Sequence, residues 1–378
     1  MDIRDLLVEM VKQDASDVYV TAESPPMYRV EGVVRPWGEE KFTSTQTIEL
    51  ANSIMTEKQK IRFAEEFEMN LALYFPDLGR FRVNIFKQRG CVGFVIRQIK
   101  INIKTLDDLE LPTILKEISM EKRGLVLVVG GTGTGKSTTL AAMIDYRNSN
   151  LPGHIISVED PIEFIHPHKR SIVTQREIGI DTFSFGGALK NAMRAAPDVI
   201  LIGEVRDIET MESAIIFAET GHLCLATLHA NNANQALERI LNFFPEDRHP
   251  QILLQLSLNL RAIISQRLIP TLDGKRVAAV EILIGTPRVK DLIYKNEVGL
   301  IKEAMGLSNQ DGMQTFDQHI FTLYKEGKIT YENALIYADS VNDLRLRIKI
   351  DKVGAGEKEG ETAKDEDTLR LKPDVKVS

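Results

Sequence analysis

The 378-residue chain contains only two cysteines and no long hydrophobic run. Cys91 and Cys224 lie far apart and outside any Cys-x2-Cys pair, which excludes a disulfide framework and a cysteine zinc site. No apolar segment approaches the roughly 18 residues that span a bilayer, and the first residues form an acidic amphipathic pattern instead of a signal peptide. We therefore expect a cytoplasmic protein without structural zinc.

Basic charge is also scarce. The chain has 47 Lys and Arg against 54 Asp and Glu, a net charge of −7. A protein that coats DNA or RNA usually presents a basic surface, so this balance argues against nucleic acid as a partner. The length and the 43% hydrophobic content are sufficient for two or three domains, each with its own core.

The first part of the chain predicts an α+β domain over residues 1–99. A helix-period opening is followed by short strand-like runs at 17–20 and 27–30. A hairpin pattern then occupies 70–86, and a further strand-like run follows at 93–97. These runs predict a small antiparallel sheet.

After a predicted linker at residues 100–112, the pattern of residues 113–350 changes. Strand-like runs alternate with helical ones, and the runs lie at 125–129, 155–158, 199–202 and 223–228. Such alternation predicts an α/β fold with a mostly parallel sheet wrapped by helices.

The end of the chain has two further patterns. From about residue 250 the pattern turns helical, including the leucine-rich stretch 252–268. Residues 351–378 are rich in charge and poor in large apolar side chains, which predicts a disordered tail.

A glycine-rich segment follows the apolar run at 125–129 and precedes a helical pattern. It has the P-loop spacing Gly-x4-Gly-Lys-Ser, and its residues are Gly130, Gly131, Thr132, Gly133, Thr134, Gly135, Lys136, Ser137 and Thr138. Backbone N–H groups that surround a polyphosphate need angles that glycine adopts easily, and we expect Gly131, Gly133 and Gly135 to supply that freedom. We expect ATP here, with Lys136 on the β- and γ-phosphates and Ser137 on Mg²⁺. A glycine-rich turn without a ligand is the alternative.

Two acidic segments follow strand-like runs, where P-loop enzymes place the groups that position water and metal. The run at 199–202 ends in Gly203-Glu204, which is typical of a Walker B element. Glu204 is thus a candidate to polarise the attacking water or to hold Mg²⁺. A strand-terminal glutamate that faces solvent is the alternative.

The second acidic segment is Glu159-Asp160-Pro161-Ile162-Glu163, at the end of the run at 155–158. Proline prevents further ladder pairing, so the acids are held at a strand end. Glu163 or Glu159 is the candidate general base, and a solvated loop is the alternative.

Histidines and arginines complete the candidate site. His222 and His229 flank the run at 223–228 at a spacing that places them on opposite faces, so they do not form a metal pair. His229 is a candidate donor to the γ-phosphate, with a structural histidine as the alternative.

The transition state of phosphoryl transfer needs positive charge on the γ-phosphoryl oxygens. Arg80, Arg82 and Arg97 lie on the predicted sheet of the first domain, and alternation places Arg80 and Arg82 on one face. The two arginines therefore contact either a bound anion or solvent. Arg176, Arg194 and Arg206 are further candidates near the acidic segments.

Taken in order, five segments resemble those of the secretion ATPase superfamily, and within it the type IV pilus retraction ATPases of the PilT/PilU family. They are RFRVNIF at 80–86, GGTGTGKST at 130–138, SVEDPIEF at 157–164, NAMRAAPDVILIGEVRD at 191–207 and ETGHLCLATLHANNA at 219–233. The resemblance covers residues 1–345.

The resemblance implies a PAS-like N-terminal domain, a RecA-like ATPase domain and a cytoplasmic homohexameric ring that acts on an inner-membrane pilus base protein. It implies that Glu163 is the catalytic glutamate, that Glu204 belongs to Walker B and that His222 and His229 form the His box. Arginines of the N-terminal domain would reach the nucleotide between domains.

Two departures locate the chain within the family. Extension ATPases usually carry a longer N-terminal region and a tetracysteine zinc insertion, and both are absent here. The retraction motif AIRNLIRE is replaced by RVKDLIYK at 288–295, after Gly285-Thr286-Pro287. This drift and the acidic tail resemble the PilU-like branch, which implies action on top of a PilT-like ring.

Two other functions remain open at this point. The altered segment at 288–295 is compatible with an adaptor ring that binds nucleotide but hydrolyses little of it. A nucleic-acid translocase has the same core, although the acidic balance argues against it.

Overall fold

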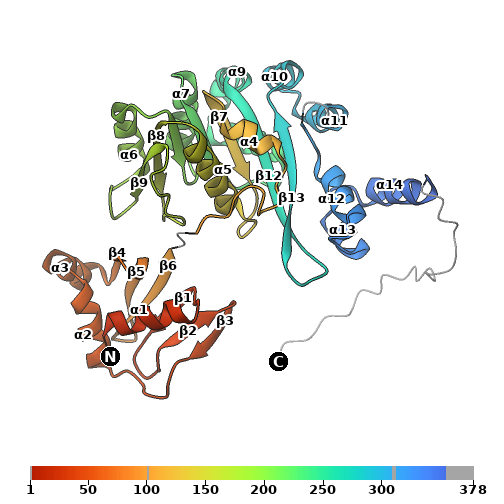
Figure 1. The fold of residues 1–378 in the computed structure, drawn as a ribbon. Coiled ribbons are helices and arrows are strands. Elements are labelled where there is room, and N and C mark those ends of the chain that lie inside the picture. Colours follow the sequence, from red (N-terminus) through yellow and green to blue (C-terminus); the bar gives the residue numbers. More distant parts are fainter. Residues whose placement is uncertain (1, 100–101, 309–311, 355–378) are drawn as a thin grey trace.

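The computed structural model describes residues 2–99, 102–308 and 312–354. Figure 1 shows two lobes, each built on its own β-sheet. The first sheet is six-stranded and uses residues before 100, and the second is seven-stranded and begins at Gly124. The predicted α/β architecture is confirmed.

The N-terminal sheet is antiparallel throughout, in the order β3-β2-β1-β6-β5-β4. Its strands are β1 (Asp17–Val20), β2 (Met27–Val30), β3 (Val33–Pro36), β4 (Glu68–Phe75), β5 (Gly79–Gln88) and β6 (Cys91–Ile99). Its helices are α1 (Ile3–Lys12), α2 (Ser44–Ile54) and α3 (Glu57–Glu66). The pattern at 17–20, 27–30 and 70–97 predicted five of these strands, whereas β3, α2 and α3 were missed.

Strand β5 positions the candidate arginines of this domain. Phe81, Val83 and Ile85 are buried in the domain core, and the side chains between them point to the other face. Successive side chains of a strand alternate between faces, so Arg80 and Arg82 share the face opposite the core. The core therefore orients both arginines outward.

The second sheet has the order β13-β12-β7-β11-β10-β8-β9. Its strands are β7 (Gly124–Val129), β8 (Gly153–Glu159), β9 (Ser171–Glu177), β10 (Val199–Ile202), β11 (Leu223–Leu228), β12 (Leu260–Pro270) and β13 (Arg276–Ile284). All neighbours are parallel except β12 and β13. The carboxyl ends of the parallel strands consequently meet at one edge.

Helices cover both faces of this sheet (Figure 1). They are α4 (Ile114–Ser119), α5 (Lys136–Asn150), α6 (Phe185–Ala192), α7 (Ile208–Glu219), α8 (Ala233–Phe243), α9 (His249–Asn259), α10 (Pro287–Tyr294) and α11 (Ile301–Leu307). Leu125, Leu127 and Val129 of β7 join one core cluster, and Val126 and Val128 join the other. A strand buried on both faces reads as a continuous apolar run, which is why β7 was recognisable.

The C-terminal helices form a smaller cluster beside the β12–β13 hairpin. They are α12 (Phe316–Lys325), α13 (Tyr331–Tyr337) and α14 (Val341–Gly354). Ile269, Val277 and Ala279 of the hairpin share a core with Phe316 and Ile320 of α12. His319 of α12 accepts a hydrogen bond at its Nδ1 from the Val280 N–H at 2.9 Å.

Two expectations for the end of the chain need correction. The stretch 252–268 is helical only as far as Asn259, because residues 260–268 form most of β12. An apolar run of this length does not distinguish a buried helix from a buried strand, and Leu260–Ser265 pair with β7 inside the sheet. The predicted tail also starts too early, because 351–354 belong to α14. The rest of that tail lies outside the described residues.

No helix in the part of the chain that the structure describes is long and apolar enough to cross a bilayer.

Candidate nucleotide site

The P-loop joins β7 to α5 and has the backbone conformation that a phosphate loop requires. Gly133 and Gly135 have φ values of +76° and +88°, which favour glycine. A Cβ on Gly135 would lie 2.8 Å from Gln266 Nε2, so this glycine is also fixed by a close neighbour. Gly131, in contrast, is not among the positive-φ glycines, and the expectation that it supplies such freedom is wrong.

Lys136 folds back over its own loop. Its Nζ donates to the carbonyl oxygens of Gly130 at 2.9 Å and Gly131 at 2.8 Å. Burial lowers the pKa of Lys136, while the carboxylates of Glu204 and Glu163 favour its charged form. The ammonium is therefore held beside the loop, close to where phosphate oxygens would lie.

Three strand ends bring the other candidates to the same place. Glu159 ends β8, Glu204 follows β10 and His229 follows β11. Together with the P-loop they line a cavity of about 490 Å³. The P-loop residues that line it are Thr132, Gly133, Thr134, Gly135, Lys136, Ser137 and Thr138. In open α/β sheets, ligands bind at this edge.

Charged side chains at this edge form a connected network. Glu204 lies 3.0 Å from Nε2 of His229 through one oxygen and 2.6 Å from Nε of Arg206 through the other. Nη1 of Arg206 in turn lies 3.1 Å from Asp160. The hydrogen bond to Glu204 raises the pKa of Arg206 more than any other neighbour does, so this guanidinium stays charged. The network fixes Glu204 between His229 and Arg206.

The two candidate general bases have different surroundings. Glu159 is half-buried and accepts from Ser157 Oγ at 2.6 Å and Gln175 Nε2 at 3.3 Å. Burial raises its pKa to about 7. Glu163 is exposed and lines the cavity directly. An exposed carboxylate such as that of Glu163 can accept a proton from water in the cavity. The Glu159 carboxylate is instead engaged by hydrogen bonds from Ser157 of β8 and Gln175 of β9.

The N-terminal arginines separate into two groups. Arg82 Nε lies 3.9 Å from Glu177 Oε1 of β9, across the boundary between the two sheets. Arg80 Nε is buried and has no hydrogen-bond partner among the described residues. Arg97 is instead bound to Asp17 of its own sheet at 2.7 Å. None of the three lines the 490 Å³ cavity, although Arg97 lies directly opposite Arg82 in the β5–β6 pair and shares its face of the sheet.

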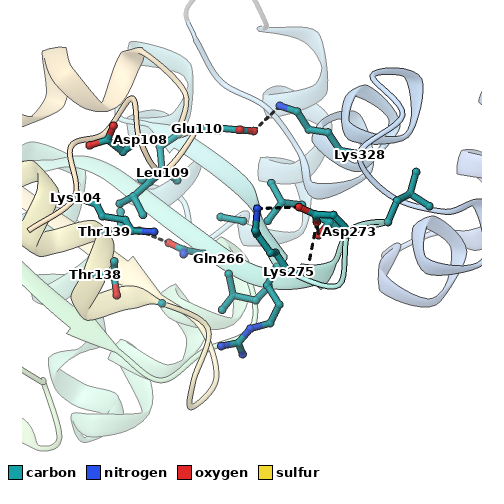
Figure 2. Close-up of a pocket in the computed structure, with 18 of the residues that line it drawn as sticks. Lys104, Asp108, Leu109, Glu110, Thr138, Thr139, Gln266, Asp273, Lys275 and Lys328 are labelled. Carbon is teal, nitrogen blue, oxygen red and sulfur yellow. Dashed lines mark hydrogen bonds and ion pairs between the residues drawn. The ribbon is translucent and has the colours of Figure 1, made fainter. Parts of the chain in front are cut away.

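A second cavity of about 790 Å³ lies on the other side of the P-loop (Figure 2). It shares Gly135, Thr138, Leu268 and Arg276 with the first cavity. Figure 2 shows Thr139 hydrogen-bonded to Gln266, and the ion pairs Lys328–Glu110 and Lys275–Asp273 among the residues that line this cavity. Both volumes fall in the range of about 300–1,000 Å³ that is typical of small-ligand sites.

The donor set of the first cavity fits Mg²⁺. Ser137 supplies a hydroxyl and Glu204 a carboxylate, and hard oxygen ligands are what Mg²⁺ prefers beside substrate phosphates. Among the residues that the structure describes, no three His, Cys, Asp or Glu side chains gather into a metal-binding group.

Sequence reasoning missed two parts of the site. Gln266 of β12 accepts from Thr139 at 2.7 Å and lies against Gly135, but it falls in the stretch expected to be helical. Glu177 was not singled out, because a strand-terminal glutamate beside an arginine carries no motif. Arg206 was named only in general terms, and its place between Glu204 and Asp160 required the structure.

The chain matches the family described as "Type II/IV secretion system protein" over residues 1–315. A match over this share of the chain shows membership, and the protein belongs to this family of secretion ATPases. This identifies the class that the P-loop and the strand-end acids indicate.

Within that class, the chain is a type IV pilus retraction ATPase of the PilT/PilU family. It is 58% identical to the Pseudomonas aeruginosa "Type IV pilus ATPase PilU", covering 93% of this chain and 92% of that protein. The P. aeruginosa "Type IV pilus retractation ATPase PilT" is 43% identical over 88% of this chain and 97% of its own length. The structure titled "Crystal Structure of the Pilus Retraction Motor PilT and Bound ADP" aligns with a TM-score of 0.86 at 40% identity, covering 92% and 99% of the two chains.

Proposed function

We propose that this ATPase is a hexameric motor that powers or assists type IV pilus retraction and twitching motility, together with a PilT-like ring. The 58% identity to a protein named PilU, against 43% to one named PilT, supports the PilU-like assignment. The protein acts from the cytoplasm, bound at the inner membrane through the pilus base protein. We expect that the protein needs neither nucleic acid nor zinc for this function.

The observation that carries the proposal is that one cavity collects the P-loop, Glu163, Glu204 and His229. Phosphoryl transfer needs little covalent chemistry from the protein, and catalysis rests on positioning and electrostatic stabilisation. These residues supply the parts of such a site from four separate strand ends.

Each residue has a defined role in hydrolysis. The backbone of residues 130–138 binds the phosphates, and Lys136 moves its ammonium from the Gly130 and Gly131 carbonyls to the β- and γ-phosphate oxygens. Ser137 and Glu204 hold Mg²⁺, which when bound neutralises charge on those oxygens. The nucleoside extends past Thr138 into the 790 Å³ cavity, which adjoins the phosphate loop.

The acids and histidine act on the attacking water. Glu163 accepts a proton from the water as general base, and Glu204 orients that water. His229, held by Glu204 at 3.0 Å, donates to the γ-phosphate. Arg80 and Arg82 approach the phosphoryl oxygens when the domains move, and Arg97 takes part only if its contact with Asp17 breaks.

Steady-state ATP hydrolysis by the purified full-length protein tests this function. We expect turnover by the parent protein, and a loss of at least about 10³-fold in kcat for Lys136→Ala and Glu204→Gln. Native mass spectrometry with and without ATP would report the hexamer.

A matched control is Lys60→Ala, which removes an ammonium bound to Glu57 within α3, far in sequence from the P-loop. Variants at Lys136 and Glu204 that hydrolyse ATP like the parent would refute the site. A folded, ATP-binding hexamer without turnover would instead favour the adaptor ring, and stimulation by single-stranded DNA would favour a translocase.

A further inference from the structure

Glu177 is a buried carboxylate that the hydrolysis scheme above does not use. It ends β9, its exposed fraction is 1%, and it lies outside the residues that line the nucleotide cavity. Burial raises its pKa, while Arg82, the Ile162 N–H and Arg80 favour its ionised form. Because burial of an unpaired carboxylate is unfavourable, the groups around Glu177 show what stabilises its charge.

The two carboxylate oxygens of Glu177 face two different parts of the molecule. Oε1 lies 3.9 Å from Nε of Arg82, on strand β5 of the N-terminal sheet. Oε2 accepts a hydrogen bond from the N–H of Ile162 at 3.4 Å. Ile162 directly precedes Glu163, the proposed general base. A single side chain therefore contacts both the N-terminal domain and the acidic loop at 160–163.

The charges around Glu177 do not balance. Arg80 and Arg82 both favour its ionised form, and the Nε of Arg80 is buried without a partner in the described ranges. Asp181 faces the same place, but its carboxylate accepts from the Glu177 N–H at 2.9 Å and opposes ionisation of Glu177. Two guanidinium groups thus share one buried carboxylate, and they retain capacity for a further anion.

We propose that Glu177 is a positioning residue that couples the N-terminal arginines to the loop carrying Glu163. This proposal rests on the proposed function, in which Arg80 and Arg82 serve ATP hydrolysis. While the arginines lie against Glu177, the carboxylate holds the Ile162 N–H and so the loop. Arg82 and Glu177 thereby place the loop and Glu163 before the N-terminal domain moves the arginines to the phosphates. Hydrolysis therefore depends on where the N-terminal domain lies.

A double-mutant cycle between Glu177 and Arg82 tests this coupling. Glu177→Gln keeps the size of the side chain and an acceptor for Ile162 but removes the charge that Arg82 faces. We expect kcat to fall about tenfold while the KM for ATP stays within about twofold, because misplacement of catalytic groups lowers the chemical step. In the Arg82→Gln background, Glu177→Gln should cost less than about twofold in kcat.

Asp181→Asn is the matched control, because Asp181 contacts the backbone of Glu177 and is hydrogen-bonded to neither arginine. Its kcat should stay within about twofold of the parent. Equal costs of Glu177→Gln with and without Arg82, or a tenfold loss in Asp181→Asn, would overturn the coupling. Either result would leave the proposed function standing if Lys136→Ala remains inactive.

Amide hydrogen exchange supplies a second readout that does not need Glu177→Gln to fold. In full-length Arg82→Gln, we expect the peptide that covers 160–164 to exchange several-fold faster than in the parent, because Glu177 loses its cationic neighbour. Unchanged exchange of this peptide would contradict the coupling. Arg35→Gln, which changes an exposed arginine on β3 of the same sheet, should leave this exchange as in the parent.

Discussion

The charged side chains at the carboxyl edge of the second sheet are paired more closely than those on the arginine face of the N-terminal sheet. At the edge, Asp160, Arg206, Glu204 and His229 contact one another at 2.6–3.1 Å in an unbroken chain. On the arginine face, Arg82 lies 3.9 Å from its acid and Arg80 Nε has no described partner. The difference indicates that the first half of the site is assembled within one domain, whereas the second half is left to be completed.

Of the changes considered, replacing Arg82 on the arginine face should have the largest effect on kcat. In the proposed scheme, Arg82→Gln removes positive charge that the transition state needs, and we expect a loss of about 10³-fold in kcat. Arg97→Gln, whose guanidinium is bound to Asp17, should change kcat by less than about threefold. Steady-state ATPase assays on both variants would measure this, and equal losses would mean that the two arginines act alike.

Replacing the acids within the edge should have the next largest effect. Glu163→Gln removes the exposed carboxylate that lines the cavity, and we expect kcat to fall about 10²-fold. Glu159→Gln keeps an acceptor for Ser157 and should lose less than about tenfold. Single-turnover hydrolysis would separate chemistry from product release, and a larger loss in Glu159→Gln would reverse the assignment of the base.

A change in the P-loop should weaken binding by a smaller factor. Gly135→Ala places a Cβ 2.8 Å from Gln266 Nε2, at a residue with φ of +88°. We expect a loss of about 10-fold in nucleotide affinity and about 1–2 kcal/mol in the free energy of unfolding. Calorimetric titration with ADP and urea unfolding would measure both. At Gly274, where φ is also positive but no neighbour lies within 4 Å, alanine should leave ADP binding unchanged.

The last prediction concerns how the free energy of unfolding depends on pH through Glu159, and it tests the edge without changing catalysis. Burial raises its folded-state pKa to about 7, from an ordinary 4.5, so the folded protein binds more protons than the unfolded chain between these values. The carboxyl group therefore lowers the free energy of unfolding as pH rises from about 4.5 to 7, by at most about 3 kcal/mol. Urea unfolding at several pH values should give a flatter profile for Glu159→Gln, and an unchanged slope would contradict the raised pKa.

The pattern of the chain was enough to predict most of the fold. Buried parallel strands such as Gly124–Val129 read as continuous apolar runs, and alternating strands such as β5 place Arg80 and Arg82 on one face. The prediction of helix for residues 260–268 was wrong. Residues 260–265 are buried among other strands, and an apolar run of this composition is equally compatible with a buried helix.

The candidate site was only partly predictable. The P-loop, Glu204 and Glu163 follow recognisable strand ends, so order along the chain is sufficient to find them. Glu177 and Gln266 act through neighbours that are distant in sequence, namely Arg82 and Thr139. Such contacts depend on how the strands and domains pack and leave no local pattern.

Gln266 lies at a junction of the whole molecule. Its side chain contacts Thr139 and Gly135 of the phosphate loop, and its strand continues into the β12–β13 hairpin. Gln266 pairs with Val280, whose N–H is bound by His319 of α12. Gln266 thus links the phosphate loop to the C-terminal helices through a cross-strand pair of the β12–β13 hairpin. The same hairpin therefore borders the phosphate loop at Gln266 and packs against α12 at Ile269, Val277 and Ala279, so one pair of strands serves both regions.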